Sequence, residues 1–192
     1  MVVVIVLCIL NFINFVFGCY PIINHDQSQY CSAQYVFTGV VRSSRETDSE
    51  AVFQIQLTSN IKGRIGFPRS MTTVYGRGRL NSCGPTRLNR NQEYILYAST
   101  YDPSTNRPEI FVQHDPNFTN LNRIKRYDCS CEIEIDLPRQ PFPNSMTPAE
   151  DKCVITEREY NCNFFKGYCG RRNGIYGSRV CQWIAPNNVC PP

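Results

Sequence analysis

Hydrophobic and polar residues in the first half of the chain alternate with the two-residue period of β-strands. The clearest case is the segment 51–57, where every second residue is large and apolar, so that these side chains share one face. Other short segments rich in branched and aromatic residues lie at 35–41, 71–75, 93–98 and 109–112. Residues 42–50 are predicted to form a polar hairpin loop. Five short strands joined by such turns predict a small closed barrel.

A short helix is predicted after the last of these strands. Asp115 is a suitable capping residue, and Pro116 suits the first helical turn. Phe118 and Leu121 follow at helical spacing, and we expect the helix to end near Tyr127. The fold class is therefore mainly β with a minor helical part.

The composition changes after Cys129. Residues 137–148 contain several prolines and little apolar pattern, which predicts an extended linker or loop. The remaining segment is rich in cysteine and glycine and has few long apolar runs, so we expect crosslinks to stabilise it. We place a domain boundary near residue 130, with a barrel domain at 19–130 and a small disulfide-rich subdomain at 131–192.

The first 18 residues are apolar and carry no charged side chain, and they end at Gly18. This pattern predicts a secretory signal peptide (1–18) that is cut between Gly18 and Cys19. The alternative is an uncleaved anchor, but the run is at the short limit for a membrane span. Since no second apolar stretch is long enough to cross a bilayer, we expect a secreted, extracellular product without a membrane span.

The chain has 11 cysteines, and Cys8 leaves with the signal peptide. The remaining even number predicts a disulfide framework formed in an oxidising compartment. Asn117-Phe118-Thr119 is an N-glycosylation sequon, which agrees with secretion.

The net charge is only +4, and two groups of basic residues stand out. One is at Arg77, Arg79, Arg87 and Arg90, and the other at Arg123, Lys125 and Arg126. Such clusters can bind nucleic acid or heparin, but solvated arginines on loops are the simpler interpretation. Secretion argues against a nucleic-acid partner.

Several landmarks occur in one order: Cys19, Cys31, Cys83-Gly84 between two strands, and Cys129-Ser130-Cys131. Together with Lys62-Gly63 after the second strand and Glu93-Tyr94-Ile95-Leu96 in the fourth, this pattern resembles the tissue inhibitors of metalloproteinases. Those proteins are netrin-like modules on a five-stranded Greek-key barrel of the oligonucleotide/oligosaccharide-binding (OB) type. The resemblance extends from Cys19 to about Cys131. Beyond it, only the cysteine richness and Cys181-Gln182-Trp183 are similar.

The resemblance implies two disulfides, Cys19–Cys83 and Cys31–Cys129. A third bridge of the family joins the second cysteine of a terminal Cys-x-Cys to a cysteine just past the fifth strand. Here Pro21 stands where the Cys-x-Cys would have its second cysteine. Gln113 and His114 lie where the partner cysteine past the fifth strand is expected. Both ends are absent together, so no unpaired thiol is left. The six cysteines from Cys131 onwards allow fifteen pairings, which the sequence leaves open.

The resemblance also implies the activity. A catalytic zinc keeps one coordination position open, normally filled by water. The free amine and the carbonyl of Cys19 can displace that water and chelate the partner's zinc, and the Cys19–Cys83 bridge would fix them in advance. The predicted proteinase-binding wedge is Cys19, Tyr20, Pro21 and Ile22, flanked by Leu80 and Asn81. The chain would need no cofactor of its own and would share the zinc of the target.

The second residue of the predicted mature chain is expected to set selectivity. In the family this residue is small, carries a hydroxyl and points into the specificity pocket of the proteinase, whereas this chain has Tyr20. A phenol buries more apolar surface but requires a deep pocket. Pro21 stiffens the wedge but removes a backbone donor, and without the third bridge the terminus is looser.

Other functions remain as alternatives. Cys19 can be an ordinary structural half-cystine in a non-inhibitory netrin-like module that binds an extracellular protein or a heparin-like polyanion. We do not expect an enzyme, because His25 and His114 lack metal-ligand spacing and disulfide sulfur is no nucleophile. The acidic residues Asp26, Glu46, Asp48 and Glu50 are interpreted as loop solubilisers. The C-terminal subdomain is expected to bind matrix, a proenzyme or an exosite.

Overall fold

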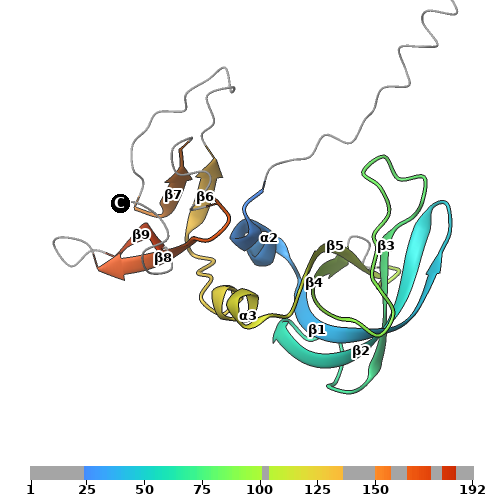
Figure 1. Ribbon diagram of the computed structural model, residues 1–192. Coiled ribbons are helices and arrows are strands. Elements are labelled where there is room, and N and C mark those ends of the chain that lie inside the picture. Colours follow the sequence, from blue (N-terminus) through green and yellow to red (C-terminus); the bar gives the residue numbers. More distant parts are fainter. Residues whose placement is uncertain (1–23, 101–103, 136–149, 157–163, 174–178, 185–192) are drawn as a thin grey trace, which may run out of the picture.

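A computed structural model describes residues 24–100, 104–135, 150–156, 164–173 and 179–184. Its largest element is a closed barrel of five strands in the order β1-β2-β3-β5-β4, and two small two-stranded sheets follow it in sequence. Two short helices, α2 and α3, lie between the barrel and these small sheets (Figure 1). The predicted fold class, a five-stranded barrel with a minor helical part and a disulfide-rich C-terminal region, is confirmed.

Each barrel strand contains one of the predicted segments and extends it. The strands are β1 (Tyr35–Glu46), β2 (Glu50–Lys62), β3 (Met71–Arg77), β4 (Glu93–Thr100) and β5 (Pro108–His114). In β2 the buried residues alternate with partly exposed ones from Ala51 to Leu57, as a half-buried strand requires. All neighbouring barrel strands pair antiparallel except β3 and β5, which close the barrel through one parallel pair, Tyr75 with Glu109.

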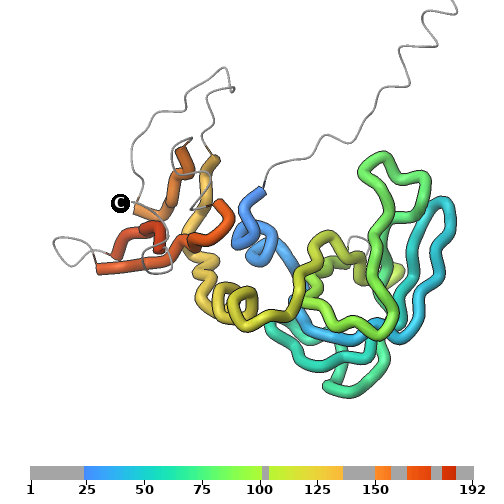
Figure 2. The backbone as a smooth tube through the Cα atoms, viewed as in Figure 1, coloured from blue at the N-terminus to red at the C-terminus, as the bar shows by residue number. Residues whose placement is uncertain are grey.

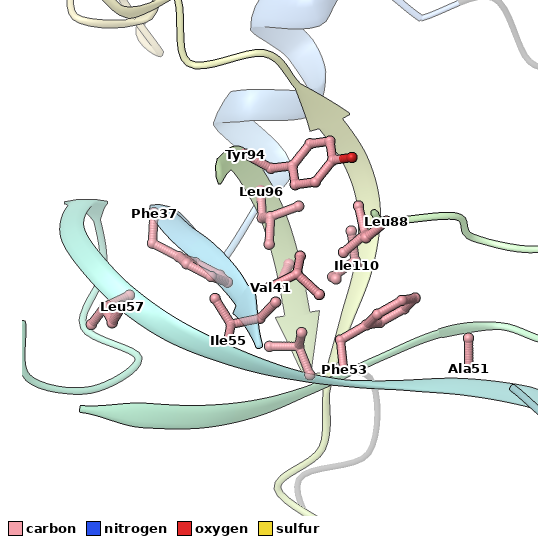
Figure 3. Packing of buried hydrophobic residues seen from close by; sticks show 12 residues of the cluster. Phe37, Val41, Ala51, Phe53, Ile55, Leu57, Leu88, Tyr94, Leu96 and Ile110 are labelled. Atoms are coloured by element: carbon pink, nitrogen blue, oxygen red, sulfur yellow. The ribbon is translucent and has the colours of Figure 1, made fainter. Parts of the chain in front are cut away.

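Apolar side chains from all five strands fill the barrel. Figure 3 shows part of this core, in which Phe37 and Val41 of β1 face Ile55 of β2 and Leu96 of β4. These side chains are fully buried. The pairing of β1 with β2 contains register shifts, one of them between Thr38 and Gly39. Such bulges bend a strand, which allows a small barrel to close.

The polar hairpin loop predicted at 42–50 is wrong. Strand β1 continues to Glu46 and β2 begins at Glu50, so only residues 47–49 form the turn. Arg45 pairs with Val52, and Glu46 with Ala51. Residues 42–46 are exposed. A strand that is exposed to water has the same polar composition as a loop, so the sequence pattern does not distinguish the two.

The predicted helix exists but is shorter. Helix α3 spans Phe118–Ile124, and its N-cap is Asn117, whose side chain accepts a hydrogen bond from the backbone N–H of Asn120. The prediction that Asp115 caps the helix is wrong; the carbonyl of Asp115 instead accepts from Asn117 N and Asn120 Nδ2. The other helix, α2 (Asp26–Ser32), was not predicted.

The described C-terminal part consists of two small sheets. Strands β6 (Glu132–Ile135) and β7 (Lys152–Ile155) pair parallel, and β8 (Tyr168–Asn173) and β9 (Arg179–Ile184) pair antiparallel. Their shared core is formed chiefly by the disulfides Cys131–Cys181 and Cys153–Cys169. This agrees with the expectation that crosslinks hold a segment with little apolar core. The predicted linker at 137–148 lies outside the described residues.

Helices α2 and α3 connect the barrel to these sheets in space. Figure 2 shows the chain running from α2 into the barrel and returning through α3 towards β6. The disulfide Cys31–Cys129 ties the last turn of α2 to the segment after α3. This is the pairing that the family resemblance implies. In the part of the chain that the structure describes, no helix combines the length and apolar character needed to cross a membrane.

Candidate functional site

The predicted wedge falls partly outside the described residues: Cys19, Tyr20, Pro21 and Ile22 all precede residue 24. The flanking residues Leu80 and Asn81 are described. They lie in the loop between β3 and β4, where both are exposed and the side chain of Leu80 is 79% accessible. A large apolar side chain so fully in water is available for contact with a partner.

This loop is held firmly against the tip of the β1–β2 hairpin. The backbone N–H groups of Arg79 and Leu80 donate to the carbonyls of Thr47 and Asp48, at 3.0 and 2.9 Å. Gly78 makes the close approach possible, because a Cβ atom there would lie 2.3 Å from the backbone nitrogen of Glu50. The guanidinium of Arg79 also lies 2.8 Å from the carboxylate of Asp48, which is an exposed pair of small energetic value.

A tight turn orders the next residues. Asn81 Oδ1 accepts from the N–H of Cys83 at 3.0 Å, and its carbonyl accepts from Gly84, which has φ of +76°. Cys83 is disulfide-bonded. The six other described cysteines pair with one another, so the partner of Cys83 lies outside the described residues. The predicted Cys19–Cys83 bridge therefore stays a prediction.

The strongest polar cluster of the described chain surrounds Asp26, at the start of α2. Its Oδ1 lies 2.7 Å from Nε2 of His114 in β5, and its Oδ2 accepts from Arg123 at 3.0 Å. The same Oδ2 accepts from the hydroxyl of Tyr127 at 2.6 Å and lies 3.3 Å from that of Tyr97 in β4. One carboxylate thus joins α2 to β4, β5 and the α3 region. We name these five residues the Asp26 network.

Burial and hydrogen bonding act in opposite directions on Asp26. Burial by itself raises the pKa of this carboxyl group, but His114, Tyr127 and Arg123 together outweigh it, so that the pKa lies below its usual value. Burial and the nearby Asp26 charge raise the pKa values of Tyr97 and Tyr127, which therefore stay protonated and donate. The interpretation of Asp26 as a loop solubiliser is wrong: its side chain is only 12% exposed and is bound on several sides.

Two further contacts fix α2. At its C-terminal end, Lys62 Nζ donates to the carbonyls of Tyr30 and Cys31 at 2.8 and 2.7 Å, which joins it to the end of β2. On its other side, buried Gln27 accepts from Cys169 N and donates to Cys169 O, both at 2.8 Å. The N-cap residue, His25, is 1% exposed and packs edge-on against Trp183. Helix α2 is therefore the junction between the barrel and the C-terminal sheets.

Sequence reasoning missed the Asp26 network. Its only clue was His114, which stands where the family would have a cysteine. Arg123 was taken as a solvated member of a basic cluster, whereas its side chain is 17% exposed and pairs with Asp26. Asp48 agrees better with the expected role of a loop solubiliser, because it is exposed in the turn. Glu50, at the start of β2, pairs with Arg107.

Three cysteine sulfurs, those of Cys131, Cys169 and Cys181, lie within 4.8 Å of one another. All three belong to disulfides, and disulfide sulfur is a poor zinc ligand because it is not a thiolate. This group is accordingly two crosslinks packed side by side. It contributes to the C-terminal core rather than to a metal site.

Comparison with protein families identifies part of the chain. Residues 28–120 match the UNC-6/NTR/C345C module, which is the netrin-like family. The match begins within α2, covers the barrel and ends within α3. Modules of this kind are extracellular binding or inhibitor domains rather than enzymes. A search of curated proteins finds no match.

The first prediction concerns Asp26. Since its folded pKa is below the unfolded value of 3.8, the ionised carboxylate stabilises the fold above that pH, and this stability is lost as the pH falls through the folded pKa. We expect Asp26→Asn to lower the free energy of unfolding at pH 7 by about 3 kcal/mol. We also expect the stability of the variant, measured by urea titrations, to fall less steeply than that of the wild type as the pH drops below 3.8.

Asp48→Asn is the matched control, because Asp48 is also paired with an arginine but is 64% exposed. It should change stability by less than about 1 kcal/mol. An acid-unfolding profile of Asp26→Asn that overlays the wild-type profile would contradict the assignment.

The second prediction concerns Asn117, which is exposed and caps α3 through Oδ1. The amide nitrogen remains available for a glycan, so we expect the protein secreted from eukaryotic cells to carry one there. Asn117→Asp removes the sequon but keeps a good cap, whereas Asn117→Ala removes both and costs about 1 kcal/mol. Intact mass and thermal unfolding separate these effects. Equal masses for wild type and Asn117→Asp would refute the glycosylation.

Proposed function

We propose that the chain is a secreted inhibitor of zinc metalloproteinases, which chelates the target's catalytic zinc through the backbone amine and carbonyl of Cys19. The observation that carries the proposal is the ordered loop around Cys83. Its backbone is fixed to the hairpin tip, its cysteine is disulfide-bonded, and it presents Leu80 and Asn81 to solvent. A bridge from this loop to Cys19 would attach the amino terminus to a rigid support.

The chemistry requires only groups that every mature chain end possesses. An α-amine titrates near pH 7.7–8.0 in model compounds, so at neutral pH about 1 kcal/mol suffices to deprotonate it for metal binding. Ordering a flexible terminus costs about 1–2 kcal/mol per residue, which a prior crosslink removes. Neither atom of Cys19 is a leaving group, and the bound terminus therefore blocks the zinc without being cleaved.

The Asp26 network supports the same proposal, because it fixes the chain just after the predicted wedge. Helix α2 starts only a few residues after the predicted wedge, and its first residue is held to β4, β5 and the α3 region. The chain leading to the wedge therefore starts from a fixed point. In this chain, which lacks both cysteines of the family's third bridge, we propose that this polar contact supplies part of the missing restraint.

The alternative, a netrin-like module that binds an extracellular protein or a heparin-like polyanion without inhibition, is compatible with the same fold. The two functions differ in whether the terminal amine matters. A matrix or proenzyme partner for the C-terminal sheets also remains a proposal.

The third prediction tests the amine directly. We expect one alanine inserted between the signal peptide and Cys19 to abolish inhibition of a metalloproteinase catalytic domain, because it removes the amine from the chelating position. An alanine added after Pro192 is the control and should leave the inhibition constant unchanged. N-terminal sequencing must show Cys19 first in the unextended protein. Undiminished inhibition by the extended protein would favour the binding module.

The fourth prediction concerns selectivity. Tyr20 should favour proteinases with a deep specificity pocket over those with a shallow one by at least about tenfold, because a shallow pocket cannot bury the phenol. Tyr20→Ser should reduce or remove this preference, while the pocket-independent Asn81→Ser should preserve it. Inhibition constants on one proteinase of each kind measure the effect. Equal constants for the unmodified protein would refute it.

A further inference from the structure

A cleft of about 240 Å³ lies between α3 and the segment that leads into β8. Phe118, Thr119 and Asn122 line it from the helix, with Arg126 just beyond the helix end. Lys166 and Tyr168 line the opposite wall. None of these residues belongs to the loop around Cys83, so the cleft is a separate surface.

The apolar part of this surface is unusually exposed. Phe118, which lines the cleft, is 81% accessible. Phe165 does not line it but precedes the lining residue Lys166 in the sequence, and it is 56% accessible. These are two of five large apolar side chains that the described chain exposes to this degree. Exposed aromatic rings at the edge of a cleft mark a contact surface, because a partner that covers them removes apolar area from water.

The charged part of the surface is basic. Arg126 and Lys166 form no salt bridge with the described residues, and no acidic residue lines the cleft. Arg123, which also lines it, is already neutralised by Asp26. The cleft therefore combines an apolar edge with two positive charges that no acidic residue in the described part of the chain neutralises. A complementary ligand has a large apolar group flanked by negative charge.

Both walls are held in place. The guanidinium of Arg123 donates to the carbonyl of Phe165, which joins α3 to the opposite wall. Tyr168 is the first residue of β8 and precedes Cys169, which is bonded to Cys153. A rigid surface loses little conformational freedom on binding.

We propose that this cleft binds an acidic segment of a partner protein, which inserts one large apolar side chain against Phe118 and places carboxylates near Arg126 and Lys166. The volume is below the roughly 300–1,000 Å³ of most small-molecule sites, which suits a single side chain. A sulfated polysaccharide would match the cations but would leave the apolar edge exposed. The observations therefore favour a peptide ligand.

The fifth prediction uses the full-length secreted protein and a phage-displayed library of random twelve-residue peptides. The library is first depleted on the Phe118→Ser variant. We expect the enriched peptides to carry Trp, Phe or Leu flanked by Asp or Glu, because that pattern matches the cleft. Synthetic copies should bind the unmodified protein at least tenfold more tightly than Phe118→Ser or the double variant Arg126→Glu, Lys166→Glu, in fluorescence polarisation.

Two controls sharpen the experiment. Leu80→Ser removes a comparably exposed apolar side chain from the β3–β4 loop and should not change peptide affinity. Peptides with lysine in place of their acidic residues should bind the double charge-reversal variant better than the unmodified protein. Unchanged thermal unfolding and intact disulfide mass show that the variants fold.

Three results would overturn the proposal. One is the absence of peptides that depend on Phe118. Another is enrichment of basic peptides. The third is binding of a heparin octasaccharide that is lost in the double charge reversal but unchanged in Phe118→Ser, because this would define a polyanion site. None of these results bears on inhibition by Cys19, whose test uses the terminal amine.

Discussion

One carboxylate, that of Asp26, holds the parts of this molecule in register. Its two oxygens contact side chains from β4, β5 and the α3 region, so the start of α2 cannot move without breaking several hydrogen bonds at once. Because the group is mostly buried, an unpaired charge left there would be costly, which makes the arrangement all-or-none in character. On the opposite side of the same helix, Gln27 bonds both the N–H and the carbonyl of Cys169. The barrel meets α2 and α3 through this network and through an apolar cluster that contains Val36, Ile95 and Ile124. Helix α2 meets the C-terminal sheets through Gln27 and through the packing of His25 on Trp183.

This arrangement differs physically from a crosslink. A disulfide restricts mainly the unfolded chain and is insensitive to pH, whereas the Asp26 network acts in the folded state and requires an ionised carboxylate. Where the family resemblance implies a third bridge, this chain has Pro21 and His114 instead. His114 contributes to the network from the end of β5. An ionic contact, which also engages the α3 region through Arg123 and Tyr127, is therefore proposed to take the place of a covalent restraint on this strand end.

The sequence predicted the parts of the fold that follow from local pattern. The five barrel strands were found because alternating residues such as Phe53, Ile55 and Leu57 face one core. The continuation of β1 from Arg42 to Glu46 was missed because all five residues are exposed, and an exposed polar strand has the composition of a loop. Helix α2 was missed because seven residues give too little periodicity, and its stability comes from contacts such as that of Lys62 with its C-terminal carbonyls. The Asp26 network could not be predicted, because its partners are 71 to 101 residues away in sequence.

The fold also allows the two recognition surfaces proposed above to be separate. The Cys83 loop depends on backbone hydrogen bonds to the β1–β2 hairpin, and the α3 cleft depends on Arg123 and the β8 disulfide. Their supports do not overlap, so a ligand at one surface need not distort the other. If a partner bound at the cleft is itself attached to a proteinase, it would raise the effective concentration of that proteinase near the amino terminus of this chain. Weak zinc chelation by a loosened terminus would then suffice for inhibition. In this way a chain with Tyr20, Pro21 and one fewer crosslink would retain the inhibitory activity proposed for it.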